Sequence, residues 1–343
     1  MTGTIVITGV SGFIARHVAL AFLREGATVR GTVRAPSKAE GVRKGLAAHD
    51  PAAADPARLS FIAADLTADA GWREAMAGAS AVMHVASPFP MAQPRDRNAL
   101  TPAARDGALR VISAALDAGV PRIVMTASMV TMMYRPGRPA VFPVAENDWT
   151  DIGWNALSAY VVSKTEAERA AWKLVEDRGA RDRFTTINPG LVAGPALDRD
   201  FGASIELIRM IMAGAYPAMP PAAYPIVDVR DVADMHVAAA TRRETGGRRL
   251  MAVGGVMSMA EIGAHLKKIA PDLAARAPTA TLPSLVVRLA AMADRNLAAV
   301  IPDLGARPDP QADYVAALTG FGARPAKDAI GAAARSLAKV GAV

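Results

Sequence analysis

Tyr160 and Lys164, in the sequence YVVSK, are the residues whose types and spacing point most directly to chemistry. Residues four positions apart share one face of a helix, with their Cβ atoms about 5–6 Å apart. A lysine ammonium at that distance favours the ionised form of a tyrosine hydroxyl. Tyr160 is therefore a candidate general acid toward a carbonyl oxygen. The same spacing also occurs in ordinary pairs on a helix surface, so the hypothesis needs support from elsewhere in the chain.

Ser128 gives part of that support. It follows the apolar run 122–126, which predicts a buried strand. Open α/β sheets bind their ligands at the carboxyl ends of the strands. We therefore expect the Ser128 hydroxyl to lie at this edge, where it can hydrogen-bond a substrate carbonyl.

A glycine-containing turn follows the first apolar run, with the sequence GVSGFIA over residues 9–15. Gly9 allows a tight turn from strand to helix, and Gly12 lets the backbone approach a pyrophosphate. The spacing differs from the common G-x-G-x-x-G pattern, and a plain structural turn can also contain two glycines. Its place at the start of an alternating α/β chain favours a dinucleotide site, with Gly9, Ser11, Gly12, Phe13 and Ile14 at the phosphates.

The end of the second predicted strand indicates which dinucleotide binds. An acidic residue there binds the ribose hydroxyls of NAD, whereas an arginine accommodates the 2′-phosphate of NADP. The chain has Arg34 at this point, Lys38 four residues later, and no acidic residue before Glu40. The sequence therefore predicts NADP(H), the alternative being that Arg34 is an ordinary surface arginine. We expect the rest of the cofactor to lie along residues after the third and fourth strands, namely Asp65, Leu66, Val85, Ala86 and Ser87.

Short apolar runs alternate with longer amphipathic stretches through the first half of the chain. The runs at 4–8, 28–33, 59–63, 81–85, 122–126 and 184–187 predict strands, and those at 13–24, 102–118 and 156–178 predict helices. This order predicts an α/β fold with a doubly wound parallel Rossmann sheet. We expect residues 1–189 to form the dinucleotide-binding domain. Residues 190–343 are predicted to form a smaller, mostly helical substrate lobe, with segments near 226–253 crossing back to the sheet.

Three helices are predicted in the second half, at 261–269, 284–295 and 326–338. Ser258 and Glu261 have the spacing of a capping box at the start of the first of these helices. Residues 203–225 combine a Met- and Ile-rich helical pattern with a proline-rich loop, which suggests a cover over the substrate pocket.

The composition excludes several classes of protein. With 52% hydrophobic and 21% charged residues the chain is not intrinsically disordered, and without cysteine it has no disulfide, thiolate metal site or cysteine nucleophile. The five histidines are widely spaced, so no metal site is expected. The net charge of +7 is scattered, which indicates a solvated surface and no nucleic-acid partner. The sequence has neither a membrane-spanning run nor a basic leader, so we expect a cytoplasmic enzyme without a membrane partner, and leave a homodimer open.

Taken together, the motifs resemble those of the extended short-chain dehydrogenases/reductases, and within them the dihydroflavonol-reductase-like aldehyde and ketone reductases. The matching segments extend from residue 4 to about 240 in family order, and the helix 160–172 is especially specific. They are TGVSGFIA (8–15), TVR (32–34), HVASPF (84–89), TPAARDGALRVISAALDAGV (101–120), MTAS (125–128), YVVSKTEAERAAW (160–172), NPGLVAGP (188–195) and VDVRDVADMH (227–236).

The resemblance implies a catalytic triad of Ser128, Tyr160 and Lys164, with NADPH as hydride donor. In this family Tyr160 would donate the proton, Lys164 would hold the ribose, and Pro189 would contact the cofactor. The family commonly has two serines after the fifth strand, whereas here Ala127 precedes Ser128. Ser128 is therefore the expected member of the triad, with Thr131 as a substitute.

Apolar residues near the predicted site suggest an apolar or aromatic aldehyde or ketone, including a dicarbonyl, as the small-molecule substrate. Phe89, Met129, Met210 and Tyr216 are candidates for the pocket, although methionines also fill cores. Two related enzymes remain as alternatives, an NAD-dependent sugar-nucleotide epimerase or dehydratase and a 3β-hydroxysteroid dehydrogenase-like enzyme. A non-catalytic dinucleotide-sensing regulator is a more remote alternative, because it would be expected to lack the Tyr160/Lys164 pair.

Overall fold

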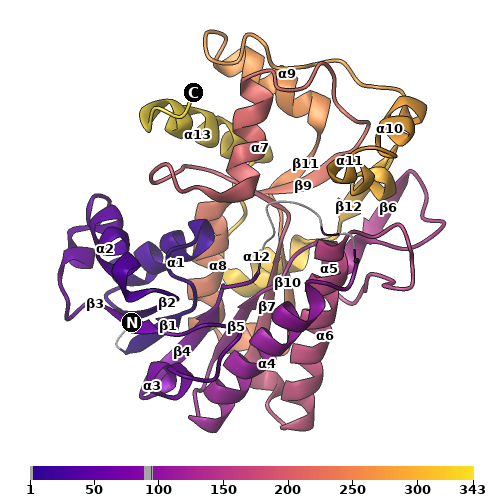
Figure 1. Cartoon of the computed structure of the whole chain (residues 1–343). Coiled ribbons are helices and arrows are strands. Elements are labelled where there is room, and N and C mark those ends of the chain that lie inside the picture. Colours follow the sequence, from indigo (N-terminus) through magenta and orange to yellow (C-terminus); the bar gives the residue numbers. More distant parts are fainter. Residues whose placement is uncertain (1–2, 89–93, 95) are drawn as a thin grey trace.

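The computed structural model describes residues 3–88, 94 and 96–343. Within these residues, seven parallel strands form one sheet in the order β3-β2-β1-β4-β5-β7-β10 (Figure 1). The strands are β1 (Thr4–Ile7), β2 (Thr28–Val33), β3 (Leu59–Ala63), β4 (Ala79–His84), β5 (Ile123–Thr126), β7 (Phe184–Pro189) and β10 (Arg249–Ala252). The chain starts near the middle of the sheet and builds outward in both directions, which confirms the predicted doubly wound fold.

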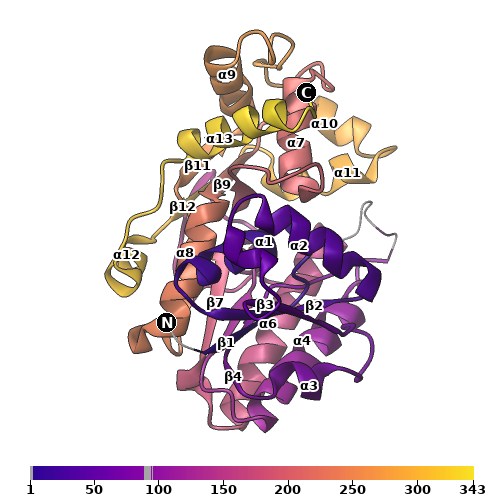
Figure 2. The same ribbon diagram turned by 90° about the vertical axis from the view of Figure 1, so that its left-hand side faces the viewer.

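Both faces of the sheet are covered by helices, because its strands are apolar on both sides. Along β1, Ile5 and Ile7 belong to one hydrophobic cluster, and Val6 between them belongs to another. The first cluster includes residues of α1 (Phe13–Arg24) and α8 (Val229–Thr241). The second includes residues of α3 (Trp72–Met76), α4 (Thr101–Asp117) and α6 (Ala159–Asp177), which lie on the other side of the sheet (Figure 2).

The upper part of the molecule in Figure 1 has its own hydrophobic core. The described residues form there a three-stranded sheet of β8 (Leu191–Ala193), β9 (Ala223–Asp228) and β11 (Gly255–Ser258). Three helices pack with it, namely α7 (Gly202–Met212), α9 (Met259–Ile269) and α13 (Ala326–Lys339). Ile205, Ile262 and Ile330, one from each helix, are completely buried in this core.

Several segments connect the two parts. β10 lies in the large sheet beside β7, although it follows β9 of the small sheet in sequence. β12 (Arg307–Pro310) pairs with β6 (Val141–Val144), and α12 (Asp313–Thr319) packs near β10 and α8. The remaining helices are α2 (Ala39–Ala47), α5 (Val130–Met133), α10 (Ser284–Ala290) and α11 (Arg295–Ala298). No helix of the described chain combines the length and apolarity needed to cross a bilayer.

The predicted elements agree with the structure except at a few places. The strands 28–33 and 59–63 and the helix 13–24 have the predicted bounds. The capping box is also confirmed, since Glu261 N donates to Ser258 Oγ at 3.1 Å and the Glu261 carboxylate accepts from Ser258 N. The single helix at 284–295 is wrong: the chain leaves α10 after Ala290, and Asp294 caps a second helix, α11, by accepting from Asn296 N at 2.8 Å.

Candidate active site

The parallel sheet brings the predicted site residues to one edge, because all seven of its described strands end on the same side. Gly9 follows β1, Arg34 follows β2, and Val85 follows β4. Ser128 lies just after β5, and Pro189 is the last residue of β7. Residues far apart in the sequence therefore lie along the same edge of the sheet.

The turn between β1 and α1 has the features of a phosphate-binding loop. Gly9 has φ +62°, and a Cβ at this position would lie 2.8 Å from the Cβ of Ala86, so the turn requires glycine. Gly12 is the N-cap of α1, and within the described residues no side chain caps this helix and no acidic residue occurs in its first turn. Its first N–H groups are therefore available to an anion, which fits the pyrophosphate of a dinucleotide. Ser11, Phe13 and Ile14 are partly exposed around this turn.

Thr8 is a residue of this site that the sequence reasoning missed. Its Oγ1 accepts hydrogen bonds from Val85 N at 3.1 Å and Ala86 N at 3.0 Å. Its own hydrogen is therefore donated to His84 Nδ1, 3.0 Å away. The buried hydroxyl thus ties the end of β1 to the segment after β4, where Val85, Ala86 and Ser87 are partly exposed. Threonine immediately before the glycine turn was the signal for it in the sequence.

The predicted 2′-phosphate site lies at the ends of β2 and β3. Arg34 and Lys38 are exposed, and the positive charge of Arg34 helps to lower the pKa of Asp65. The larger causes of that lowered pKa are hydrogen bonds from the hydroxyl and backbone N–H of Thr67, 2.7 and 2.8 Å from Asp65 Oδ1. The Asp65 carboxylate therefore orders its own turn. The next residue, Leu66, packs closely against Gly107 of α4, which places it between strand and helix.

The structure brings the side chains of Ser128 and Tyr160 into hydrogen-bond contact, and Lys164 lies one turn beyond Tyr160 on the same helix. Ser158 caps α6, which begins at Ala159, by accepting from Val161 N at 3.4 Å, so Tyr160 and Lys164 lie in its first two turns. Burial raises the pKa of Tyr160, while a hydrogen bond with the Ser128 side chain lowers it. Lys164 is 7% exposed, and burial lowers its pKa to about 8, against the opposing charge of Glu168. The pKa of His84 on β4 is lowered to about 3 by burial and by the charge of Lys164.

The hydroxyl of Thr131, the substitute considered for Ser128, lies within a buried set of hydrogen bonds. Thr131 is completely buried, and its hydroxyl lies 2.8 Å from the backbone oxygen of Ser128 and within hydrogen-bond distance of Glu168. Pro189 is also buried, and its carbonyl accepts from Met129 N at 2.9 Å, which fixes the segment that carries Ser128.

The four substrate-pocket candidates lie in different surroundings. Met210 on α7 and Tyr216 beyond it are partly exposed, and the Tyr216 hydroxyl contacts Met210 Sδ at 3.8 Å. Met129 is only 1% exposed and packs in the main core beside Met132 and Met133, so the structure does not bring it to an open surface. Phe89 lies outside the described residues.

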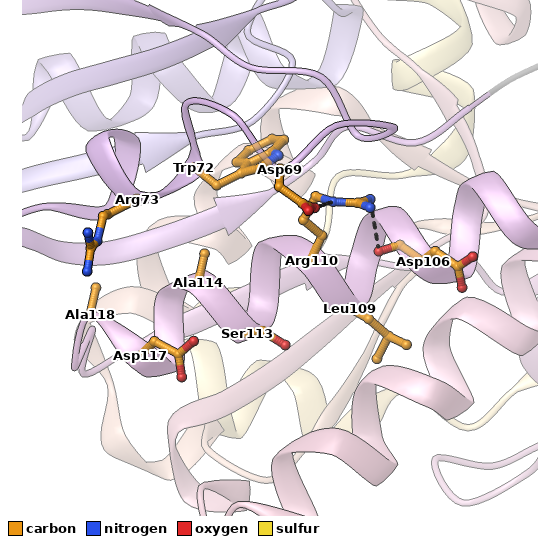
Figure 3. Close-up of a pocket in the computed structure, with 10 residues that line it drawn as sticks. All are labelled: Asp69, Trp72, Arg73, Asp106, Leu109, Arg110, Ser113, Ala114, Asp117 and Ala118. Carbon is orange, nitrogen blue, oxygen red and sulfur yellow. Dashed lines mark hydrogen bonds and ion pairs between the residues drawn. The ribbon is translucent and has the colours of Figure 1, made fainter.

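A groove of about 590 Å³ lies elsewhere, between α3 and α4 (Figure 3). Trp72 and Arg110 line it together with Asp69 and Asp106. Arg110 is held there by Asp69 and by the backbone oxygens of Leu66 and Asp106. Neither Ser128 nor Tyr160 borders this groove, so it is separate from the candidate active site.

Comparison with known proteins agrees with this arrangement of sheet, loop and side chains. Residues 5–254 match the NAD dependent epimerase/dehydratase family, so the chain belongs to this family of extended short-chain dehydrogenases/reductases. The predicted family is therefore confirmed.

Three known reductases show which members of the family this chain is similar to. Cinnamoyl-CoA reductase 1 of Petunia hybrida is 33% identical over 275 residues, which cover 79% of each chain. Dihydroflavonol 4-reductase of Hordeum vulgare is 35% identical over 224 residues, which cover 62% of this chain and 59% of that protein. The crystal structure of yeast methylglyoxal/isovaleraldehyde reductase Gre2 complexed with NADPH is 25% identical, with a TM-score of 0.78 over 99% of this chain and 100% of that chain.

Proposed function

We propose that this protein reduces an aldehyde or ketone to the alcohol with NADPH, and that Tyr160 donates the proton. The observation that carries the proposal is the hydrogen bond between the side chains of Ser128 and Tyr160, with buried Lys164 one turn further along the same helix. The family and its reductase relatives make the chain an NADP-dependent oxidoreductase, and the NADPH in the yeast reductase supports the cofactor.

The residues of this chain would divide the work as follows. Ser128 hydrogen-bonds the carbonyl oxygen and orients it toward the Tyr160 hydroxyl. Tyr160 then gives its proton to that oxygen as negative charge develops there. Lys164, still largely protonated at neutral pH with a pKa of about 8, stabilises the resulting phenolate. Burial of these groups strengthens each electrostatic interaction, because little water screens them.

The cofactor would lie along the edge of the sheet. NADPH, when bound, supplies the hydride, and the protein contributes binding, orientation and electrostatics. The first turn of α1 would hold the pyrophosphate, and Arg34 with Lys38 would hold the 2′-phosphate. Asp65 and Leu66 would lie near the adenine. Lys164 would hold the nicotinamide ribose, with Val85, Ala86, Ser87 and Pro189 along the middle of the cofactor.

We propose an apolar or aromatic carbonyl compound, including a dicarbonyl, as substrate. The names of the relatives support this class, since they act on cinnamoyl-CoA, a dihydroflavonol and methylglyoxal or isovaleraldehyde. The partly exposed Met210 and Tyr216 offer apolar contacts of this kind. Residues 1–189 would then bind the cofactor and residues 190–343 would cover the substrate, with 226–253 returning to the sheet.

The test is a panel of aliphatic, aromatic and dicarbonyl substrates, each assayed with NADPH and with NADH by the loss of cofactor absorbance. We expect reduction of apolar or aromatic carbonyls with a clear preference for NADPH. Interconversion of a sugar nucleotide by protein that retains NAD through purification would instead identify an epimerase. Size-exclusion chromatography would test the homodimer, which stays a prediction, as does the cytoplasmic location.

A further inference from the structure

Glu168 is a completely buried carboxylate one helical turn beyond Lys164, and the mechanism above gives it no role. Tyr160, Lys164 and Glu168 follow one another at four-residue intervals, so they share a face of α6. Glu168 accepts hydrogen bonds from Arg249 Nε at 2.8 Å, Thr186 Oγ1 at 2.9 Å and Asn188 Nδ2 at 3.0 Å. A buried carboxylate with this many donors is held ionised, and these interactions lower its pKa against the effect of burial.

Two side chains that bond Glu168, Asn188 and Thr131, also bond the backbone of Ser128. Asn188 Nδ2 lies 3.3 Å from the carbonyl oxygen of Ser128 and also bonds Glu168. Thr131 Oγ1 lies 2.8 Å from that carbonyl oxygen and within hydrogen-bond distance of the Glu168 carboxylate. Because a hydroxyl has a single hydrogen, Thr131 can donate to only one of them at a time. Glu168 thus orients two side chains that fix the peptide carrying the Ser128 hydroxyl.

Arg249 holds the other side of this carboxylate. It comes from β10, in the second half of the chain, and is 6% exposed. Its Nη1 donates to the backbone oxygens of Glu146 at 2.8 Å and Asp148 at 2.6 Å, and its guanidinium lies 3.8 Å from the centre of the Trp149 ring. With Nε on Glu168, the guanidinium is fixed in position on several sides.

Among the described ionisable groups near Lys164, Glu168 is the one whose negative charge favours the protonated lysine. Tyr160 and Glu168 lie on its own helix, and His84 faces it from β4 with a pKa lowered to about 3, so that it is neutral. Arg249 lies beyond Glu168 and bonds it directly. Burial lowers the pKa of Lys164, and the charge of Glu168 raises it. An ion pair as buried as Glu168–Arg249 is poor evidence for stability, because apolar replacements of such pairs are often neutral or stabilising.

We propose that Glu168 is a positioning residue of the active site: oriented by Arg249, its carboxylate holds the Ser128 peptide in place and provides a fixed negative charge one helical turn beyond Lys164. This inference rests on the proposed reductase function, since it assigns a role toward the triad of that reaction. It predicts that the charge of Glu168, and not only its shape, is required.

The decisive variant is Glu168→Gln, which keeps the shape and removes the charge. We expect kcat to fall roughly ten- to hundredfold, the size of effect known for outer-shell groups that orient metal ligands, with the KM for NADPH little changed. Without the nearby anion, protonated Lys164 is less favoured, so its pKa falls. The loss of reductase activity at high pH should therefore begin at a lower pH than in the unmodified protein.

A matched control is Asp231→Asn. Asp231 is a buried carboxylate on α8 that binds the backbone N–H and guanidinium of Arg324, and its described hydrogen bonds involve neither Ser128 nor Lys164. This acid-to-amide change should lower the unfolding temperature without moving the pH profile. An equal shift of the high-pH limb in both variants would contradict the proposal, because it would then be a general effect of lost stability.

Since Glu168→Gln leaves Arg249 buried without its anion, a double variant, Glu168→Gln with Arg249→Met, keeps the test informative if the single variant does not fold. We expect the double variant to regain a normal unfolding temperature and still show the lower kcat and the shifted pH limb. Wild-type kcat and pH profile in this folded double variant would overturn the proposal. If the unmodified protein binds NADPH but reduces no carbonyl compound, the proposed function fails instead, which is a separate outcome.

Discussion

Three buried histidines should make the folding of this protein sensitive to mild acid. The pKa of His84 is lowered to about 3 by burial and by the charge of Lys164, and burial lowers those of His236 and His17 to about 4. Hydrogen bonds explain why the neutral rings fit. His84 Nδ1 accepts from Thr8, and His236 donates from Nδ1 to Val232 O at 2.7 Å, so that its Nε2 accepts from the Thr126 hydroxyl at 2.8 Å. A protonated ring cannot accept either bond.

The size of the effect follows from these pKa values. Because the folded-state pKa is below the unfolded value of about 6.5, the folded protein binds fewer protons, and stability is present above that value and lost as the pH falls. At pH 5 each histidine then contributes a loss of about 2 kcal/mol relative to high pH. The three together lose about 6 kcal/mol, which is comparable to the about 5–15 kcal/mol that stabilises a typical protein.

The assay is urea-induced unfolding followed by circular dichroism at pH 7 and at about pH 5. The three histidines should together lower the free energy of unfolding by about 5–6 kcal/mol between these two pH values. Part of this loss is offset by Asp303, since burial raises its pKa to about 6 and a raised carboxyl pKa stabilises the folded protein as the pH falls. In His236→Gln, which cannot titrate, the fall should be about 2 kcal/mol smaller than in the unmodified protein. His265→Gln is the matched control, because His265 is partly exposed on α9 and contacts only a backbone oxygen of Lys327 among the bonds described for it. The reasoning is refuted if the pH dependence of unfolding is the same in His236→Gln, His265→Gln and the unmodified protein.

Three further predictions concern the site. Tyr160→Phe should cut turnover by roughly 10²–10⁴-fold, the contribution of a positioned general acid, while NADPH binding measured by fluorescence stays near normal; near-normal turnover would mean that the proton has another source. Arg34→Ala should remove most of a preference for NADPH over NADH of roughly 10- to 150-fold, the equivalent of hydrogen bonds of about 1.5–3 kcal/mol to a charged group; equal weakening of both cofactors would indicate stacking on the adenine. Met210→Ala and Tyr216→Ala should change the ranking of carbonyl substrates in kcat/KM; a lower unfolding temperature with an unchanged ranking would identify them as packing residues.

Local patterns were enough to predict six of the seven described strands of the sheet and the order in which they alternate with the main helices. The run at β1 is apolar at successive positions because Ile5 and Val6 belong to clusters on opposite faces of the sheet. The turn after β1 needs glycine because Gly9 has a positive φ. The glycine in the sequence therefore predicts the turn directly. The positions of Ser128 and Tyr160 in the fold were predictable for a related reason, since Ser128 follows a strand and Tyr160 lies within a helix whose patterns are clear. Their roles in catalysis stay predictions.

Features that depend on distant partners were not predictable in this way. Nothing near Glu168 in the sequence indicates Arg249, which lies 81 residues away and reaches it only because β10 returns beside β7. The hydrogen bond between Thr8 and His84 likewise depends on β1 and β4 being neighbours. The break between α10 and α11 was missed although it is local. The apolar pattern that predicts one helix continues across the break, where the Asp294 side chain caps the second helix.

The polar groups at the carboxyl edge of the sheet also explain why this site can be rigid. Burying a polar group is costly unless it is hydrogen-bonded. Here buried groups on different elements bond one another: Thr8 bonds His84, and Asn188 bonds Glu168. These bonds link the ends of β1 and β4 in one case, and of β7 with α6 in the other. Because none of them involves a reacting group directly, they can hold the loop and the helix that carry Ser128 and Tyr160 before a substrate arrives. Precise placement of reacting groups lowers the entropic cost of reaching the transition state, so the rate of this enzyme should depend on side chains that never touch its substrate.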